Sequence, residues 1–321
     1  MKMSDLLYKI NISDIDLTDE RYKISFSEND ISFLAQSLKE TGLITPPVVR
    51  PLNNKFIIIS GFNRVRALIH NKETTIVVYK INPNTTDYLC LLKSISALAF
   101  QRLLTQAELI ICTRRLYQFI DKEEIAKKSP AIFNTELGPR FVGDLLTIGA
   151  LPDPALELIH MGHLSFKSAK RISLFEKDAI KIFLDIFSKI HASQNKQLEI
   201  ILYIMEIAAR DAIKPKAFYM NQEIQDILLD KKKEPGLKTK DLRDYLFEQR
   251  FPIIFKTRQR VKEKITSIKL GNKIKFLPPE NLDSQTYSIS FTAKNYKEFL
   301  SNVQDLNAGL ENKALKEIFN Q

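Results

Sequence analysis

The sequence is poor in cysteine, with only Cys90 and Cys112 among 321 residues. Both lie inside apolar helical patterns without a second Cys or a His at ligand spacing, so buried thiols are expected instead of a disulfide or a metal site. The sequence also lacks any apolar run near the roughly 20 residues that a membrane span needs. Its first residues lack the basic-then-apolar pattern of a signal peptide. These absences predict a cytoplasmic chain without a membrane partner.

There is no internal repeat and no low-complexity tract, which argues against a solenoid. At 321 residues the chain is long for a single core, so three folded units are expected. With 44% hydrophobic and 27% charged residues, the composition is that of ordinary globular domains. The chain is therefore expected to fold.

The formal net charge of +10 is concentrated in one segment. Residues 231–275 contain 15 Lys and Arg against 5 Asp and Glu, so the charges of the remaining residues cancel. A concentrated positive field suits a polyanion such as DNA, because each neutralised phosphate releases condensed counterions. A solvated linker followed by an amphipathic helix has the same composition, and charge alone leaves both interpretations open.

Short strands and short helices alternate over the first hundred residues. Apolar residues at helical spacing predict a helix over residues 28–41, with Ser27 and Asp30 as a capping-box-like start and Gly42 as its stop. Turn residues and β-branched runs predict the elements that follow. These are a hairpin of residues 48–50 and 56–59 around Asn53-Asn54, a helix over 62–70 and a strand over 74–79. Residues 1–84 are therefore expected to form a small α/β domain.

After Thr85 the pattern changes to nearly continuous helical periodicity, which predicts an all-helical middle domain over residues 85–230. Breaks are expected at Pro130, Gly138-Pro139, Pro152, Gly162 and Pro215. A polar linker is predicted at 231–236. The elements predicted after it are helices at 238–248 and 256–268, strands at 273–277 and 287–292, and a helix at 294–306. Residues 231–321 thus form a small α+β domain, and the fold class is α+β multidomain.

The turn at Gly61 has the residues of a phosphate-binding site. Gly61 lets the backbone approach an anion, and the helix that follows offers free N–H groups. Arg64 and Arg66 can supply charge-assisted hydrogen bonds. A plain strand-to-helix turn with two surface arginines has the same residues, so this signal alone does not separate the two interpretations.

Two stretches of the chain resemble one known family. LAQSLKETGLITPPVVRP at 34–51 and ISGFNRVRA at 59–67 resemble the N-terminal domain shared by ParB-like partition proteins and sulfiredoxins. The run from Gln101 to Lys128, and the LP, LI and GHLS frame at 151–165, resemble the helix-turn-helix core of ParB-like proteins. This resemblance implies a double-stranded DNA-binding protein, a homodimer formed through the C-terminal domain, a ParA-like ATPase as partner and a nucleoid-associated location.

The helix predicted over residues 140–148 is the candidate recognition helix of this core. Its outward polar residues, the candidates for DNA contact, are Arg140, Asp144 and Thr147. The stretch before it, SPAIFNTELGPR, is longer than the three or four residues of a standard turn. Either the preceding helix extends into this stretch, or the stretch makes DNA contacts of its own, for example through Asn134.

A second basic cluster follows the GHLS frame, in a segment without any acid between Glu157 and Glu176. DNA contacts, chiefly to phosphates, are predicted for Lys167, Ser168, Lys170 and Arg171. A solvated helix face is the alternative, because charge runs often have no other role.

The resemblance also implies a nucleotide. ParB-like proteins bind CTP with magnesium through a G-E-R-R-like turn and a later E-N-x-Q-R run. The residues retained here for phosphate binding are Gly61, Arg64, Gln101 and Arg102, with Arg66 nearby. Leu98 and Ala99 stand where the family has Glu and Asn, and neither has a side-chain oxygen to offer magnesium. No cofactor is therefore expected other than, at most, CTP bound weakly and without magnesium, and no catalytic or metal-ligating residue is assigned.

The expected function is sequence-specific binding of double-stranded DNA in chromosome or plasmid partitioning. The alternatives are a plasmid- or phage-type transcriptional regulator and a CTP-dependent DNA clamp with CTPase activity. Sulfiredoxin chemistry is excluded, because the turn Gly61-Phe62-Asn63-Arg64 lacks the cysteine nucleophile which that reaction needs.

Overall fold

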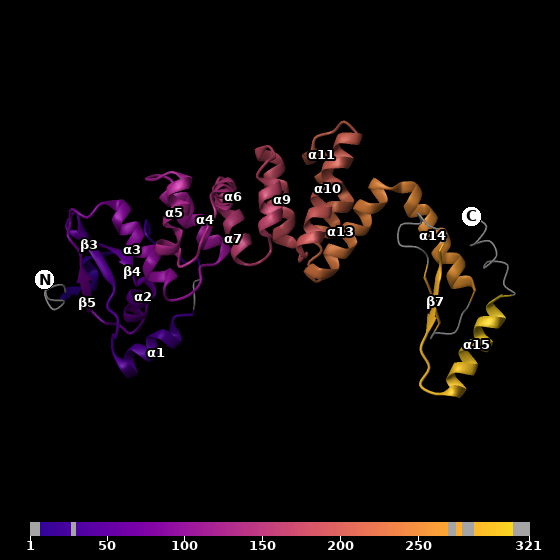
Figure 1. The fold of residues 1–321 in the computed structure, drawn as a ribbon, viewed down its shortest axis with the longest axis horizontal. Helices are drawn as coiled ribbons and strands as arrows, with labels where there is room; N and C mark the ends of the chain where they lie inside the picture. Colours follow the sequence, from indigo (N-terminus) through magenta and orange to yellow (C-terminus); the bar gives the residue numbers. More distant parts are fainter. Residues whose placement is uncertain (1–6, 27–29, 269–273, 278–285, 311–321) are drawn as a thin grey trace. The chain divides into compact units, whose positions relative to one another are not determined.

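The computed structural model describes residues 7–26, 30–268, 274–277 and 286–310 of the chain (Figure 1). Contacts between Cα atoms divide the chain into two compact units, Met1–Leu198 and Glu199–Gln321. The predicted domain boundaries after residues 84 and 230 do not coincide with this division, and they stay predictions.

A five-stranded mixed sheet forms the N-terminal part of the first unit, in the order β1-β5-β3-β4-β2. Its strands are β1 (Leu7–Asn11), β2 (Ile15–Asp16), β3 (Val48–Leu52), β4 (Lys55–Ser60) and β5 (Thr75–Lys80). The predicted hairpin is confirmed as the antiparallel pair β3 and β4. Asn53 and Asn54 make its turn with φ of 48° and 61°, a left-handed backbone that asparagine tolerates better than most residues. The Asn pair therefore sets where the chain reverses.

The two helices predicted for this domain are confirmed as α1 (Ser32–Thr41) and α2 (Phe62–His70). Gly42 ends α1 with a φ of 73° and a ψ of −176°, a positive-φ backbone that glycine adopts more readily than other residues. Asp30 accepts a hydrogen bond of 2.9 Å from the first backbone N–H of α1, whereas Ser27 lies outside the described residues.

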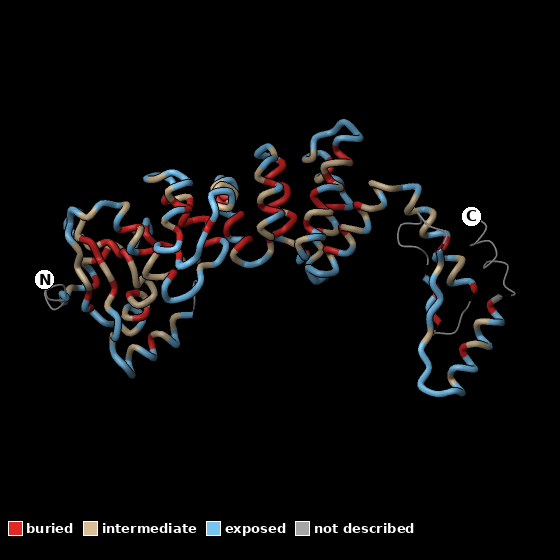
Figure 2. The backbone as a smooth tube through the Cα atoms, in the orientation of Figure 1, coloured by how far each residue is buried: buried red, intermediate tan, exposed pale blue. Residues whose placement is uncertain are grey.

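One apolar core joins the sheet to α2. Val49 and Ile58 from the hairpin, Val65 from α2 and Val78 from β5 are buried together, in the part of the chain drawn red in Figure 2. Burial of each such side chain contributes about 1.5–3 kcal/mol. The core fixes the end of β4 against the start of α2, where Gly61 lies.

The rest of the first unit is helical, as predicted. Its helices are α3 (Asp87–Ala99), α4 (Gln106–Leu116), α5 (Lys122–Phe133), α6 (Pro139–Gly149), α7 (Asp153–His160), α8 (Phe166–Ile172) and α9 (Lys177–Lys189). The breaks predicted at Gly138-Pro139, Pro152 and Gly162 are confirmed: Pro139 is the first residue of α6, and the other two positions lie between helices. None of the described helices of the chain is long and apolar enough to cross a membrane.

The break predicted at Pro130 is wrong, because α5 continues through this residue to Phe133. A proline inside a helix leaves the carbonyl four residues earlier without its usual N–H donor. Here Ser129 replaces that donor, since its buried Oγ donates to the carbonyl of Ala126 at 2.7 Å. The same Oγ accepts the backbone N–H of Leu137 at 2.8 Å. Ser129 therefore lets the helix extend and also holds the connection to α6.

The second unit begins within α10 (Gln194–Arg210), which crosses the division between the units. Its other elements are α11 (Pro215–Tyr219), α12 (Gln222–Leu229), α13 (Pro235–Arg250), α14 (Pro252–Ser267), β6 (Ile274–Leu277), β7 (Ser288–Phe291) and α15 (Tyr296–Leu310). The helices and the hairpin predicted for this region are confirmed, with β6 and β7 paired antiparallel. Lys273, the predicted first residue of that hairpin, lies outside the described residues.

Two ion pairs one heptad apart tie α13 to α10. Arg243 Nη2 lies 2.7 Å from Glu199 Oε2, and Arg250 Nε lies 2.7 Å from Glu206 Oε2. Residues seven positions apart lie on the same side of a helix, so both pairs belong to one seam. Leu242 and Leu246 of α13 are fully buried, and this burial stabilises the helix more than the part-exposed ion pairs do.

Candidate functional site

The end of β4, the start of α2 and the end of α3 enclose a cavity of about 260 Å³, called here the Gly61 cavity. The segment Tyr22–Ser25 forms another wall. Of the residues predicted to bind a phosphate, Gly61, Arg64 and Gln101 line this cavity. The structure thus brings together side chains that are up to 40 positions apart in the chain.

Gly61 is required for the shape of this turn. Its φ is 93°, in the left-handed region, and a Cβ added there would lie 2.9 Å from Cβ of Pro47. The close approach that demands glycine is therefore to Pro47, and no other residue fits without moving Pro47, just before β3. Gly61 is also the N-cap of α2. The N–H groups of a first helical turn lack intrahelical acceptors, so an anion in the cavity would find donors there.

Arg64 is the unpaired cation of the cavity. It is half-buried, and no hydrogen bond or ion pair ties its guanidinium to another described residue. Arg66 is also half-buried but lies outside the cavity lining. Arg64 alone of the two arginines on α2 is therefore placed to meet a ligand in the Gly61 cavity.

Arg102 has a structural partner instead. Its Nη1 donates to Oε2 of Glu108 at 2.7 Å, and its Nη2 donates to Oε1 of the same carboxylate. Glu108 is 1% exposed and also accepts the backbone N–H of Thr105, completing the capping box of α4. Burial by itself would raise the pKa of Glu108, but these hydrogen bonds hold that pKa below its ordinary value. Arg102 therefore stabilises the start of α4.

The lining of the Gly61 cavity does not suit magnesium. None of its described lining residues is an Asp or a Glu, and Leu98 occupies part of the wall. Magnesium needs hard oxygen ligands, usually carboxylates. No group of three or more His, Cys, Asp or Glu that could hold a metal occurs among the residues that the structure describes. The cavity fits a phosphate group through Gly61 and Arg64, but it does not fit a metal-bound triphosphate.

The second site is the outward face of α6. Arg140 and Thr147 are exposed and Asp144 is half-buried, and their spacing of four and three residues puts them on one side of the helix. Val142, Leu145 and Ile148 are fully buried on the other side. Ser129 shortens the connection from α5 to residues 134–138, so α5 and α6 have the two-helix form of a helix-turn-helix.

Helix α8 lies beside this face. The rings of Phe141 and Phe166 are 5.4 Å apart, and Lys170 Nζ lies 2.6 Å from Oδ1 of Asp144. Lys167 and Arg171 are exposed on α8. Together, Arg140, Asp144, Thr147, Lys167, Lys170 and Arg171 form what we call the α6–α8 surface.

Ser168 differs from its predicted neighbours. It is fully buried, its backbone N–H donates to the capping Oγ of Ser165, and the two hydroxyls lie 2.8 Å apart. A buried hydroxyl cannot reach a phosphate unless α8 opens. Gln197, which sequence reasoning missed, fixes this start of α8 by accepting the N–H of Ser165 at 2.9 Å and donating to the carbonyl of His163. A glutamine within a helical pattern gave no signal of that role.

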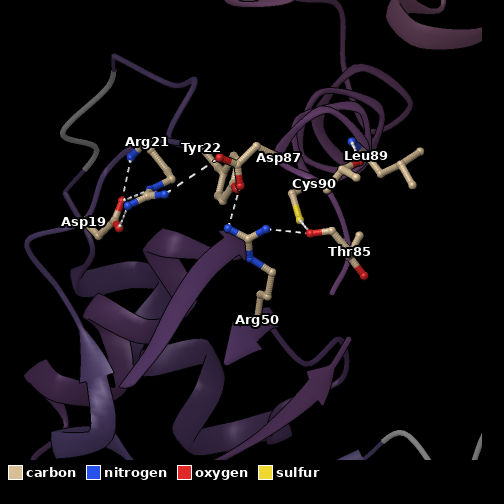
Figure 3. Close-up of polar contacts among 9 residues, drawn as sticks. Asp19, Arg21, Tyr22, Arg50, Thr85, Asp87, Leu89 and Cys90 are labelled. Atoms are coloured by element: carbon tan, nitrogen blue, oxygen red, sulfur yellow. Dashed lines mark hydrogen bonds and ion pairs between the residues drawn. The ribbon is translucent and has the colours of Figure 1, made fainter. Parts of the chain in front are cut away.

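A buried arginine was also missed by sequence reasoning. Arg50 in β3 is 5% exposed and donates to the carbonyl of Thr85 and to Oδ1 of Asp87, both at 2.6 Å (Figure 3). Tyr22 donates to the same Asp87 oxygen at 2.7 Å. The hydrogen bonds from Tyr22 and Arg50 lower the pKa of Asp87, and burial raises the pKa of Tyr22. The signal was an arginine inside an apolar strand, since a buried charge requires a partner.

This network positions the segment that lines the Gly61 cavity. Ser94 of α3 donates to the carbonyl of Tyr22 at 2.7 Å, and Arg115 of α4 donates to the carbonyl of Lys23 at 2.8 Å. The ring of Phe26 stacks on that of His160 at 5.3 Å. One wall of the cavity is therefore held by helices that also support the α6–α8 surface.

The comparison with known families decides the relationship. Residues 2–95 match the family model described as the ParB N-terminal domain. A probable chromosome-partitioning protein ParB from Chlamydia trachomatis is 28% identical over 190 residues, covering 56% of this chain and 64% of that protein. The chain is ParB-like. The chain thus matches less than two thirds of the length of this relative.

Another relative matches a longer part of the ParB-like chain, and two solved structures are also similar to it. A probable chromosome-partitioning protein ParB from Borreliella burgdorferi is 24% identical over 235 residues, covering 71% of this chain and 86% of that protein. Among solved structures, a truncated Caulobacter crescentus ParB complexed to the centromeric parS site is 19% identical, with a TM-score of 0.36, and covers 59% of this chain and 96% of that one. The same protein complexed with CTP-gamma-S is 21% identical, with a TM-score of 0.27, and covers 55% and 96%.

Proposed function

We propose that the ParB-like chain binds double-stranded DNA and acts in chromosome or plasmid partitioning. The observation that supports this most is the exposed polar face of α6, which α5 and Ser129 hold in a helix-turn-helix form beside the basic helix α8. The ParB N-terminal domain and the partitioning relatives support the same function. We also propose that the chain acts in the cytoplasm in association with the nucleoid.

Each residue of the α6–α8 surface has a proposed role. Arg140 and Thr147, exposed on α6, contact base edges, which carry sequence specificity. Lys167 and Arg171 contact phosphates. Lys170 joins them when DNA phosphate replaces Asp144 as its partner, because the two negative groups compete for one ammonium.

A genome-wide DNA pull-down with the purified chain tests the proposal. Discrete peaks near a replication origin are expected for a partition protein. Peaks at promoters would instead favour the plasmid- or phage-type regulator. The absence of enriched sites, with binding that depends on salt but not on sequence, would contradict both functions.

We further propose that the chain forms a homodimer through its C-terminal elements and works with a ParA-like ATPase. The dimer is supported by apolar side chains that α15 leaves 42–74% exposed, Tyr296, Phe299 and Leu300. Duplex-reading helix-turn-helix proteins usually bind two half-sites as symmetric dimers. Sedimentation of the full chain with Phe299→Asp and Leu300→Asp tests this, since the charged side chains should give a monomer.

The Gly61 cavity supports a second proposal. Its unpaired Arg64, next to the N-terminus of α2, suits a phosphate-bearing ligand such as CTP bound without magnesium. A CTP-hydrolysing clamp is not favoured, because hydrolysis needs a metal to neutralise the charge that builds on the phosphates.

A further inference from the structure

A second cavity, of about 290 Å³, lies where Tyr22 meets the start of α3 and the end of α4. We call it the Arg115 cavity. Arg21, Asp87 and Arg115 supply its charges, Gln118 an amide, and Leu91 and Phe119 its apolar wall. Its volume is just below the range of roughly 300–1,000 Å³ usual for ligand pockets, so it suits only a small ligand group. It shares only Tyr22 with the lining of the Gly61 cavity.

The described charged side chains around this cavity form ion pairs with one another, except for the guanidinium of Arg115. Arg21 binds Asp19 at 2.8 and 2.9 Å, and Arg50 binds Asp87 at 2.6 Å, as Figure 3 shows. Lys23 binds Glu20 at 2.6 Å. Among the described residues no carboxylate lies within ion-pair distance of Arg115. The cavity wall therefore keeps one uncompensated positive charge.

Arg115 is only partly used by the fold. Its Nη1 donates to the carbonyl of Lys23 at 2.8 Å, a bond that holds its position, and no other hydrogen bond of its side chain to a described residue is present. Burial lowers the pKa of Arg115, and no ion pair with a described carboxylate offsets this effect. The side-chain amide of Gln118, exposed beside it, also has no hydrogen-bond partner among the described residues. Both groups thus have donors to offer.

We propose that the Arg115 cavity binds the carboxylate group of a hydrophobic acid. The planar guanidinium of Arg115 matches a carboxylate, and the Gln118 amide donates a further hydrogen bond. The apolar part of the ligand packs on Leu91 and Phe119. A single negative charge is favoured over a phosphate dianion, because Asp87 lies in the same wall and repels a second charge.

The probe for this site is N-acetyl-phenylalanine, and its uncharged match is N-acetyl-phenylalaninamide. Ligand-observed NMR with the full chain should show saturable binding of the acid and at least tenfold weaker binding of the amide. Arg115→Gln should weaken binding of the acid at least tenfold. Arg114→Gln, on the same helix but directed at Asp153 and Gly149, should leave it unchanged. Equal binding of acid and amide, or equal losses in both variants, would overturn the proposal.

Arg115→Gln also removes the bond to Lys23, so two further variants separate binding from folding. Gln118→Ala and Phe119→Ala leave that bond intact and should each weaken binding of the acid several-fold. Gln118→Ala, a change at an exposed polar side chain, should do so without lowering Tm. Wild-type affinity in both variants would contradict the site. A peptide ending in a free Phe carboxylate distinguishes the sources: tighter binding than the single amino acid indicates a protein C-terminus, and equal binding indicates a small-molecule acid.

Discussion

The cations of the Gly61 cavity and of the α6–α8 surface differ in whether they already have an ion-pair partner. In the cavity Arg64 has no partner among the described residues and lies by a helix N-terminus that needs no rearrangement. On the surface Lys170 is already paired with Asp144, so DNA must exchange that ion pair for a phosphate. The cavity is therefore preformed for a small anion, whereas the surface gains part of its DNA affinity only after a pair is broken. Substitutions at each region should separate these two behaviours.

The largest effect on stability is expected from Arg102→Ala, which removes a structural ion pair and leaves the lining of the Gly61 cavity unchanged. Breaking the pair with Glu108 leaves a buried carboxylate and should lower the free energy of unfolding by about 3 kcal/mol. Burial then raises the pKa of Glu108, and a raised folded-state pKa of an acid makes the folded state more stable at low pH. Chemical denaturation should thus show a deficit that is large at neutral pH and shrinks as pH falls. A variant as stable as wild type would show that the pair with Glu108 contributes little to the stability of the fold.

Next in size is the loss of DNA affinity when Lys167, Lys170 and Arg171 are replaced together by Ala. The salt dependence of binding should flatten by up to about three units, near 0.9 for each DNA phosphate that is no longer neutralised. Fluorescence anisotropy between low and moderate salt measures this slope. Asp144→Asn is the matched control on α6: it frees Lys170, so binding should tighten. An unchanged slope in the triple variant would remove α8 from the surface.

Arg140→Ala should instead reduce discrimination between a cognate site and random DNA, by about 1–3 kcal/mol, because base-edge contacts carry specificity. The comparison is the ratio of the two affinities at one salt concentration. Thr147→Ala, on the same face, should have a smaller effect. Equal losses on both DNAs would show that Arg140 contacts only the backbone.

Arg64→Ala tests the cavity by itself. Weak CTP binding, measured by equilibrium dialysis with and without magnesium, should be independent of the metal and should fall at least tenfold in the variant. No appreciable CTP turnover is expected, because no described lining residue offers magnesium a carboxylate. Arg66→Ala is the matched control, since Arg66 lies outside the lining. Steady turnover that Arg64→Ala abolishes would make the chain a CTP-switched clamp.

The smallest effect on stability is expected from Asp87→Asn. Tyr22 and Arg50 lower the pKa of Asp87 in the folded state, so its stabilising contribution is present above the unfolded value of about 3.9 and is lost as pH falls through the folded value. Asp87→Asn should therefore be less stable than wild type at neutral pH, and the difference should vanish in acid. The effect is limited to about 1 kcal/mol because the carboxylate is part-exposed and the Asn side chain keeps an oxygen that accepts hydrogen bonds from Tyr22 and Arg50. Denaturation at several pH values measures it.

Sequence periodicity predicted most of the described helices, and turn residues predicted the Asn hairpin, because both depend on residues close together in the chain. The ParB-like relationship came from motifs that resemble that family. β1 and β2 were missed, and the break expected at Pro130 was wrong. The first failure has a nonlocal cause, because β1 pairs with β5, more than 60 residues away in the chain. The second has a side-chain cause that helical periodicity does not reveal: the buried hydroxyl of Ser129 donates to the carbonyl of Ala126 and accepts the N–H of Leu137.

The candidate residues divide in the same way. Their identities and charges came from the sequence by itself, and so did the turn at Gly61 and the outward face of α6. The tertiary structure alone decided that Arg64 lines a cavity while Arg102 binds Glu108, and that Ser168 is buried. The physical reason is that local spacing sets which side of a helix a residue occupies. The availability of its charge depends on which other side chains the fold brings within hydrogen-bonding distance, such as Tyr22 and Asp87, 65 residues apart.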